Sequence, residues 1–334
     1  CRDRLAAFAV ESHARRVDTL GGFSTHLDES GLVLGNFRPG IRLGGVGPFE
    51  VGTNAVVALG TSRLVNLSVR STAGTGSETL TVGFVVGGGA APSLMIRGIG
   101  PTLGTFGVNG LVDDPVLTVL SPTSAVVATN DDWGTATNVA QITMTAAQFG
   151  AFALTAGSRD AALISSLPTG AYTAQLTGKA ATAGVALVEA YDISSGGAVA
   201  PLVNLSARTR VGTGAEVLIA GFVIAGTEPK RLLIRGVGPT LAAFGLTGIL
   251  ADPQVAVFKQ GVATALQQND NWSTGTNSAE LVATAARVGS FALPSGSRDA
   301  VLLVVAIAPL TPPRALPRTP LAARIIEVHH GTAH

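Results

Sequence analysis

Oxygen-bearing side chains gather in two matching stretches, TNDDWGTATN at 129–138 and QNDNWSTGTN at 268–277. Carboxylate and amide oxygens on a turn suit calcium, which takes about six to eight oxygen ligands. A carboxylate from elsewhere, Asp114, Asp160 or Glu189, could complete such a set. The alternative is a turn in which Asn and Asp side chains bond to the backbone. The candidate ligands are Asn130, Asp131, Asp132, Asn269, Asp270 and Asn271.

The same stretches hold the only two tryptophans, Trp133 and Trp272. An exposed indole ring could stack on a ligand, whereas a packed ring would cover the edge of a β-sandwich. The change from Asp132 to Asn271 argues against a strict requirement for charge. The pattern therefore favours a structural turn, with calcium binding as the second interpretation and ligand stacking as the third.

Two glycine-rich stretches, RGIGPTLG at 97–104 and RGVGPTLAAFG at 235–245, follow expected strands as phosphate-binding loops do. Their spacing is not G-x-G-x-x-G, and a proline follows the second glycine. No βαβ unit with a later acidic residue surrounds them. We interpret these glycines as parts of a tight turn rather than of a dinucleotide site.

The sequence GSRDA occurs twice, so that Arg159 stands beside Asp160 and Arg298 beside Asp299. An arginine–carboxylate pair inside a sandwich would fix its strands relative to one another. We predict structural ion pairs at these four residues, with a carboxylate-binding or catalytic role as the alternative.

Histidines lie only near the ends of the chain, outside the stretches that occur twice. Those stretches therefore lack a Ser-His-Asp, Cys-His or histidine-rich zinc constellation. The chain has neither G-x-S-x-G nor H-E-x-x-H. These observations favour a protein without enzyme activity. The histidines are His13, His26, His329, His330 and His334.

The chain contains an internal duplication. RLVNLSVRSTAGTGSETLTVGFVV at 63–86 returns as PLVNLSARTRVGTGAEVLIAGFVI at 201–224, and FALTAGSRDA at 152–161 returns as FALPSGSRDA at 291–300. Each copy is as long as an ordinary domain and too long for a solenoid repeat. We predict one repeat at 63–194 and a second at 201–305.

Alternating apolar residues between Gly, Pro, Asn and Asp turns predict eight strands in the first repeat. Helical spacing at 138–152 and in its copy predicts one short helix in each repeat, with the N-cap at Thr137 or Asn138 and at Asn277 or Ser278. The expected class is all-β, with two tandem β-sandwich domains of jelly-roll or Greek-key type. The expected strands are 64–71, 79–86, 93–99, 116–120, 125–129, 161–165, 171–177 and 185–191.

The second repeat does not end as the first does, because the stretch 306–334 replaces the strand pattern with Pro and Arg. We expect this tail to be divergent and the second repeat to lack its last two strands. That would leave an open sheet edge unless the tail covers it. Residues 1–62 match neither repeat and are interpreted as a linker or the remnant of a preceding β-rich segment.

Composition narrows the classes of partner. The chain is 46% hydrophobic but only 13% charged, and its net charge is +1. Such a balance gives no reason to expect nucleic acid as a partner. A single cysteine excludes an intrachain disulfide, and no apolar run is long enough for a spanning helix. We expect no cofactor, unless calcium occupies the acidic stretches.

The repeated motifs NLSxR, GFVIxG, RLLIRGxGPTL, NDNW and GSRDA, with PTGAYTAQLTG and AGVALVEAYD, resemble a tandem repeat of large secreted or surface proteins of environmental bacteria. The second half of the first repeat is also similar in pattern to bacterial pre-peptidase C-terminal domains, β-sandwich modules of secreted hydrolases. Some of those bind calcium or polysaccharide. The resemblance implies a non-catalytic module located outside the cell or on its surface.

The sequence therefore favours a non-catalytic extracellular repeat protein with a structural, adhesive or glycan-contacting role, whose partners would be polysaccharide or other surface proteins. One alternative is a fragment of a secreted hydrolase acting on polysaccharides or esters. Another is a self-assembling surface or filament subunit whose copies exchange strands.

Overall fold

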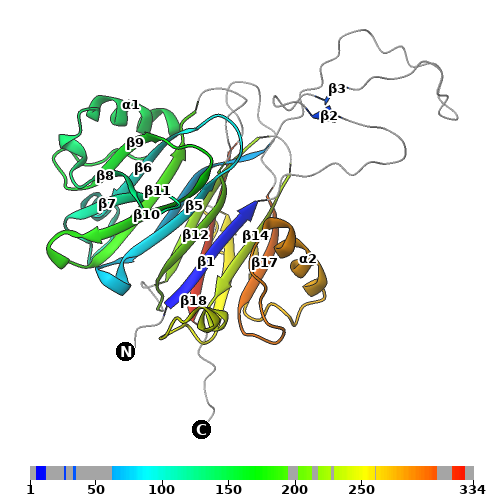
Figure 1. Cartoon of the computed structure of the whole chain (residues 1–334). Helices are drawn as coiled ribbons and strands as arrows, with labels where there is room; N and C mark the ends of the chain where they lie inside the picture. Colours follow the sequence, from blue (N-terminus) through cyan, green and yellow to red (C-terminus); the bar gives the residue numbers. More distant parts are fainter. Residues whose placement is uncertain are drawn as a thin grey trace.

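The computed structural model describes residues 62–194, 202–212, 217–226, 229–259 and 261–306. It also describes the backbone of the short segments Leu5–Ser12, His26–Leu27, Val33–Leu34 and Arg318–Glu327. Figure 1 shows the arrangement of these elements.

All eight strands expected in the first repeat are present, and the all-β class is confirmed. Apolar residues alternate with half-exposed ones along them, as in β5, where Leu80, Val82, Phe84 and Val86 are buried. The expected helix is α1 (Val139–Phe149), with Asn138 at its N-cap. The strands are β4 (Arg63–Ala73), β5 (Leu80–Val86), β6 (Ser93–Ile99), β7 (Pro115–Leu120), β8 (Val126–Asn130), β9 (Ala161–Ser166), β10 (Gly170–Gly178) and β11 (Gly184–Asp192).

The second repeat follows the same order. Its helix α2 (Ser278–Val288) has Asn277 at the N-cap. Neither N-cap asparagine bonds to the helix through its side chain. The strands are β12 (Leu202–Arg210), β13 (Leu218–Ala225), β14 (Lys230–Val237), β15 (Pro253–Lys259), β16 (Gln267–Asn269) and β17 (Ala300–Ala306). The flanking strands are β1 (Leu5–Ser12), β2 (His26–Leu27), β3 (Val33–Leu34) and β18 (Arg318–Glu327).

The strands form two antiparallel rows that run through both repeats. One row is β9-β6-β11-β4-β13-β18-β15-β16, and the other is β8-β7-β10-β5-β12-β1-β14-β17. A bridge between Leu64 and Leu202 joins them. The rows face each other across the core, where Leu67 and Ile96 of the first row meet Phe84 and Leu205 of the second. The architecture is therefore a sandwich of two long sheets.

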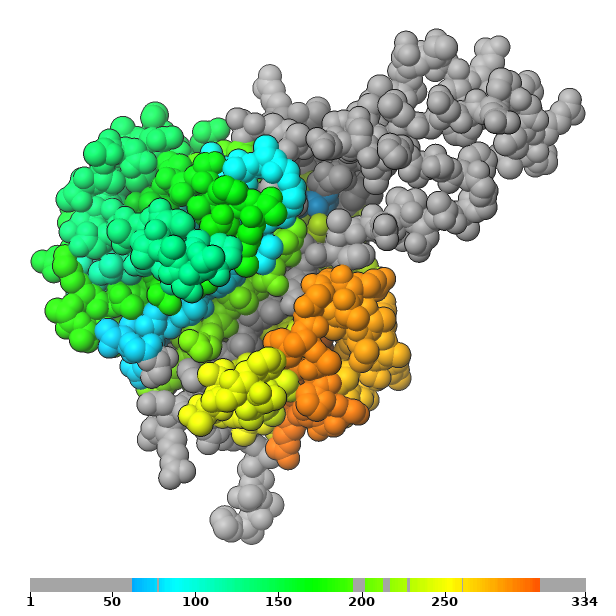
Figure 2. All heavy atoms as spheres, viewed as in Figure 1, coloured from blue at the N-terminus to red at the C-terminus, as the bar shows by residue number. Residues whose placement is uncertain are grey.

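The two repeats meet by strand pairing rather than by surface contact. β4 of the first repeat pairs with β13 of the second, and β5 of the first pairs with β12 of the second. In the space-filling view the yellow-green residues that open the second repeat run beside the cyan residues that open the first (Figure 2). Buried residues of both repeats belong to one hydrophobic cluster. The domain boundaries at 63–194 and 201–305 stay a prediction, but the strand ladders cross between them.

The second repeat obtains its last two strands from both ends of the chain. β18 pairs with β13 and β15, as β10 pairs with β5 and β7 in the first repeat. β1 pairs with β12 and β14, as β11 pairs with β4 and β6. In Figure 1 the blue arrow of β1 lies between β12 and β14. The predicted incomplete sandwich is thus corrected: the tail 306–334 supplies one missing strand and the segment 1–62 supplies the other.

Because both sheets cross between the repeats, we predict that the chain unfolds in one cooperative transition. Phe84 and Phe222 occupy matching buried positions in β5 and β13. Replacing either one with alanine should lower the free energy of unfolding of the whole chain by about 3–5 kcal/mol. Scanning calorimetry checks this expectation, with the exposed Val127→Ala as the control. Two separate transitions, of which each variant moves only one, would contradict it.

Candidate functional site

The glycine-rich turn after β6 encloses a buried carboxylate. Asp160 is fully buried, and its Oδ1 accepts a hydrogen bond of 2.8 Å from the backbone N–H of Gly100. Its Oδ2 accepts one of 3.2 Å from the N–H of Thr102, and the Thr102 hydroxyl also donates to it. These donors open the 3-10 helix Pro101–Phe106. A turn of this kind gathers N–H groups around an anion, and here the anion is a side chain of the same chain.

Gly100 is required by close packing rather than by a ligand. A β-carbon at this position would lie 2.2 Å from the carbonyl oxygen of Val112. The matching Gly238 meets the carbonyl oxygen of Leu250 at 2.1 Å in the same way. The interpretation of these glycines as parts of a tight turn is therefore supported by the geometry, and the N–H groups that resemble a phosphate cradle are already used.

The serine of GSRDA connects this carboxylate to the tryptophan. Trp133 donates its indole N–H to Ser158 Oγ at 3.2 Å, and Ser158 donates to Asp160 Oδ2 at 2.6 Å. The backbone N–H of Trp133 also donates to the carbonyl oxygen of Asp160 at 2.8 Å. The acidic stretch and GSRDA are thus two parts of one structural unit.

The second repeat reproduces the unit around Asp299, which is also fully buried. Asp299 accepts hydrogen bonds from the N–H of Gly238 at 2.8 Å and from the hydroxyls of Thr240 and Ser297. Trp272 donates to Ser297 Oγ at 3.1 Å. The same contacts in two copies show that the repeated motifs encode this bonding pattern.

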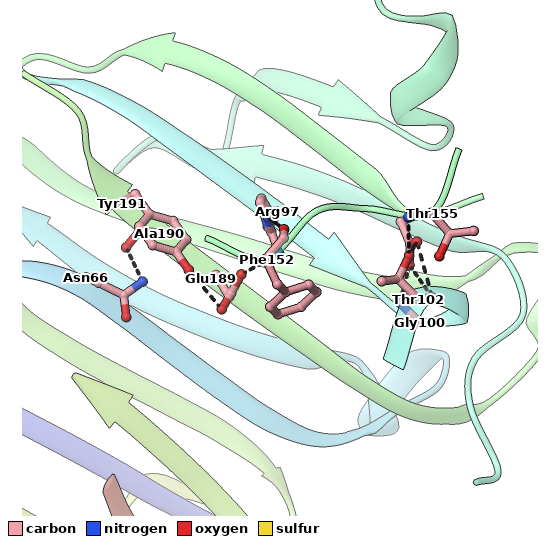
Figure 3. A network of polar contacts seen from close by, with 10 residues as sticks. Asn66, Arg97, Gly100, Thr102, Phe152, Thr155, Glu189, Ala190 and Tyr191 are labelled. Atoms are coloured by element: carbon pink, nitrogen blue, oxygen red, sulfur yellow. Dashed lines mark hydrogen bonds and ion pairs between the residues drawn. The ribbon is translucent and has the colours of Figure 1, made fainter. Parts of the chain in front are cut away.

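The arginine before each glycine turn is buried against an aromatic ring. Arg97 is fully buried, donates to the carbonyl oxygen of Phe152 at 2.6 Å and lies 4.4 Å from the centroid of that ring. It forms an ion pair with Glu189 at 3.0 Å, and Tyr191 donates to the same carboxyl group at 3.1 Å. Figure 3 shows Arg97 next to Phe152 and Glu189, with the Thr102 cluster beyond them. Burial raises the pKa of Glu189, and Arg97 opposes the shift.

In the second repeat Arg235 donates to the carbonyl oxygen of Phe291 at 2.9 Å and lies 4.2 Å from the centroid of its ring. A cation held over an aromatic face is stabilised by the charge distribution of the ring. In both copies this contact ties β6 or β14 to the loop that carries the phenylalanine.

The predicted ion pairs of GSRDA involve different aspartates from those expected. Arg159 pairs with Asp114 at 3.1 Å, and Arg298 pairs with Asp252 at 3.1 Å. Neighbouring residues of an extended segment point to opposite sides. Asp160 and Asp299 therefore face the interior while the arginines, about two-thirds exposed, lie at the surface. The predicted pairing of each arginine with the next aspartate in the sequence is therefore wrong.

The acidic stretches have the geometry of turns that bond to the backbone. Asn130 Oδ1 accepts from the N–H of Ala162 at 2.9 Å, and Asn269 Oδ1 accepts from the N–H of Val301 at 2.9 Å. Asp131 pairs with Lys179 at 2.8 Å, and this hydrogen bond lowers the pKa of Asp131 and raises that of Lys179.

The remaining members of the stretches, Asp132, Asp270 and Asn271, are half-buried. The backbone oxygen of Asp132 accepts from Asn130, and that of Asn271 accepts from Asn269. Among the residues that the structure describes, no three His, Cys, Asp or Glu side chains lie close enough together to hold a metal ion. A calcium site here stays a prediction.

Both tryptophans are buried and pack beneath the helices. Trp133 lies with Ile142 and Ala162, and Trp272 lies with Leu281 and Val301. Neither ring presents a face for stacking, so the structure corrects the prediction that Trp133 or Trp272 stacks on a ligand.

An exposed aromatic pair occurs instead at the end of each 3-10 helix. Phe106 is 60% exposed and meets Phe152 edge to face, with ring centroids 4.9 Å apart. Phe244, 58% exposed, meets Phe291 at 4.9 Å in the same way. We call Phe106–Phe152 and Phe244–Phe291 the aromatic pairs. The sequence held a signal for them, because both copies of the glycine turn end in Phe-Gly.

The aromatic pairs lie at opposite ends of the sandwich. The first follows β6, near the outer end of one row, and the second follows β14, near the opposite end of the other row. The neighbouring helices α1 and α2 mark these two ends in Figure 1. Among the described residues, no helix has the length and apolar character needed to cross a membrane.

The buried carboxylate should matter for stability. An Asp160→Asn substitution places an amide N–H₂ against donors and leaves a backbone N–H without its acceptor. We expect a loss of about 2–4 kcal/mol in the free energy of unfolding, measured by chemical denaturation. Asp299→Asn should cost a similar amount. The exposed Asp131→Asn serves as the control and should change stability by less than about 1 kcal/mol. Equal stability of Asp160→Asn and the control would show that the carboxylate is dispensable.

Comparisons with known proteins identify no family. No family model matches the chain, and no curated protein matches it. Solved structures that share some likeness include a mutant VP2 protein of infectious bursal disease virus in T=1 particles, with 15% identity and a TM-score of 0.19, covering 67% of this chain and 58% of that one. A VP2 subviral particle of the same virus has 14% identity and a TM-score of 0.19, over 67% of this chain and 61% of that one. The chain thus spans about three fifths of these proteins, and TM-scores this low carry no argument about function.

Proposed function

We propose that the chain is a non-catalytic β-sandwich module of an extracellular or cell-surface protein. In this proposal it has a structural and adhesive role, and it contacts polysaccharide through the two aromatic pairs. The observation that carries the proposal is the recurrence of the same exposed aromatic pair in both repeats, while the repeated carboxylates Asp160 and Asp299 are buried in the fold.

The inward direction of the polar motifs argues against catalysis by the repeated residues. Asp160 and Asp299 accept hydrogen bonds from backbone amides and hydroxyls, and Arg97 is sealed by Phe152 and Glu189. A catalytic acid, base or nucleophile must reach a substrate. These groups are instead occupied by contacts that hold loops to strands.

Exposure of the phenylalanines is the complementary observation. A single exposed apolar side chain is ordinary and needs no explanation. Phe106 and Phe244 differ because they occupy matching positions in both repeats and each is held by a second ring. A ring fixed in this way can lie against the apolar face of a sugar without losing much conformational freedom on binding.

The continuous sheets give these two sites a fixed separation. Because one site lies at each end of the sandwich, a single chain is better placed to bridge two polysaccharide strands than to contact one strand at closely spaced points. Where one polymer reaches both sites, the two weak contacts act together and the chain binds more tightly than through either site alone.

Retention of the purified chain on insoluble polysaccharides, cellulose and chitin among them, tests the proposal. Phe106→Ala and Phe244→Ala should each weaken binding by about 2- to 10-fold, the range expected for one aromatic contact. The double variant should lose retention. Met144→Ala is the matched control, because Met144 is similarly exposed but belongs to neither aromatic pair.

Full retention by the double variant would show that the aromatic pairs are not the contact. Turnover of a panel of polysaccharides and esters by the chain would overturn the non-catalytic role and favour the hydrolase alternative. Circular dichroism melts of all variants separate a loss of binding from a loss of fold.

A further inference from the structure

We propose that the gap between β12 and β14 is a strand-accepting site and that it takes Leu5–Ser12 from a second copy of this chain. This goes beyond the adhesive role, because it concerns how copies of the module join to one another. The proposal rests on the pairing of β1, on its origin in the chain and on the contrast with β11.

The pairing of β1 is complete on both sides. Its register runs from Leu5 opposite Arg210 to Glu11 opposite Asn204 on β12. On β14 it runs from Ala7 opposite Val237 to Ser12 opposite Leu232. β1 is therefore an interior strand, and an empty gap would expose two unpaired sheet edges to other strands. A gap of this kind recognises an extended segment mainly through backbone hydrogen bonds.

The corresponding place in the first repeat is filled in a different way. There β11 follows β10 after the short turn at 179–183, so the first repeat always completes itself. In the second repeat β18 ends at Glu327, and the next strand comes from the opposite end of the chain. Its connection to β4 runs through residues 13–62, and fifty residues can extend to on the order of 150 Å. A connection of this length is long enough to reach the second repeat of another copy.

A second copy is the favoured donor because it carries the segment that already fits. Its Leu5–Ser12 would form the same backbone pairs with the same register, so the exchange loses no contact of the strand. Within the described part of the chain there is one such donor and one such acceptor. Copies would therefore join as an open chain or close into a ring, and protein concentration would decide between donation within one copy and between copies.

Disulfide trapping with single-cysteine chains tests the proposal. Ala7 of β1 lies opposite Arg208 of β12, and Arg208 is exposed. Ala7→Cys and Arg208→Cys chains of residues 1–334, both in a Cys1→Ser background and with tags of different size, are unfolded together, refolded and oxidised. We expect a covalent heterodimer, above the level given by random collision, whose fraction rises with protein concentration, because donation of β1 from one copy to the other holds the two cysteines opposite each other.

Two controls use the matching position of the first repeat, where Leu187 of β11 lies opposite Arg70 of β4. The Leu187→Cys, Arg70→Cys chain should form its disulfide within one copy at every concentration. Ala7→Cys mixed with Arg70→Cys should give no heterodimer above random collision.

Two outcomes would overturn the proposal. In one, the mixture of Ala7→Cys and Arg208→Cys gives no heterodimer, while the chain carrying both cysteines closes its disulfide as a monomer. In the other, that double variant forms no disulfide although the first-repeat control does, which would show that β1 does not occupy the gap.

Discussion

The fold depends on a carboxylate that is buried at the point where a strand turns into a helix. Asp160 brings together the end of β6, the start of a 3-10 helix and, through Ser158, the indole of Trp133. A buried carboxylate is costly unless its oxygens are satisfied. The glycine turn supplies the required donors, and only glycine at position 100 lets the backbone approach closely enough. The glycine turn, GSRDA and the tryptophan stretch, which the sequence offered as candidate sites, thus form hydrogen bonds with one another.

The need to satisfy these buried groups explains why the motifs are nearly identical in the two repeats, while positions outside them differ. A carboxylate, a serine, a tryptophan and a glycine form one bonded unit, and changing one member leaves the others without partners. Arg97 and Arg235 follow the same logic, because each carries its own aromatic ring and carbonyl oxygen. The side chains of Asp132 and Asn271 are half-buried and take no part in these contacts, so the two repeats can differ there.

Local structure was predictable from the sequence because it follows from alternation and from turn residues. The strands of the first repeat, both helices and the packed tryptophans agree with the pattern of the sequence. The partners of Arg159 and Arg298 were not predictable, because residues adjacent in the chain face opposite sides and the paired aspartates lie far away in the sequence, just before β7 and β15. The aromatic pairs were not predicted. The exposure of Phe106 depends on the path of the 3-10 helix Pro101–Phe106, and so short an element produces no periodic pattern of apolar residues in the sequence.

The strand pairing between the two repeats was not predicted from the sequence. Repetition suggested two separate sandwiches, but each repeat offers an edge that the other pairs with, and backbone edges carry no side-chain signature. The same holds for β1. In register, Ala9 stands opposite Arg235 where Glu189 stands opposite Arg97, so the segment does not repeat the sequence of β11 and could not be found by comparing copies. What it shares with β11 is an extended backbone of sufficient length. A position defined in this way requires an extended segment that can reach it, and this is why β1 fills it without repeating the sequence of β11.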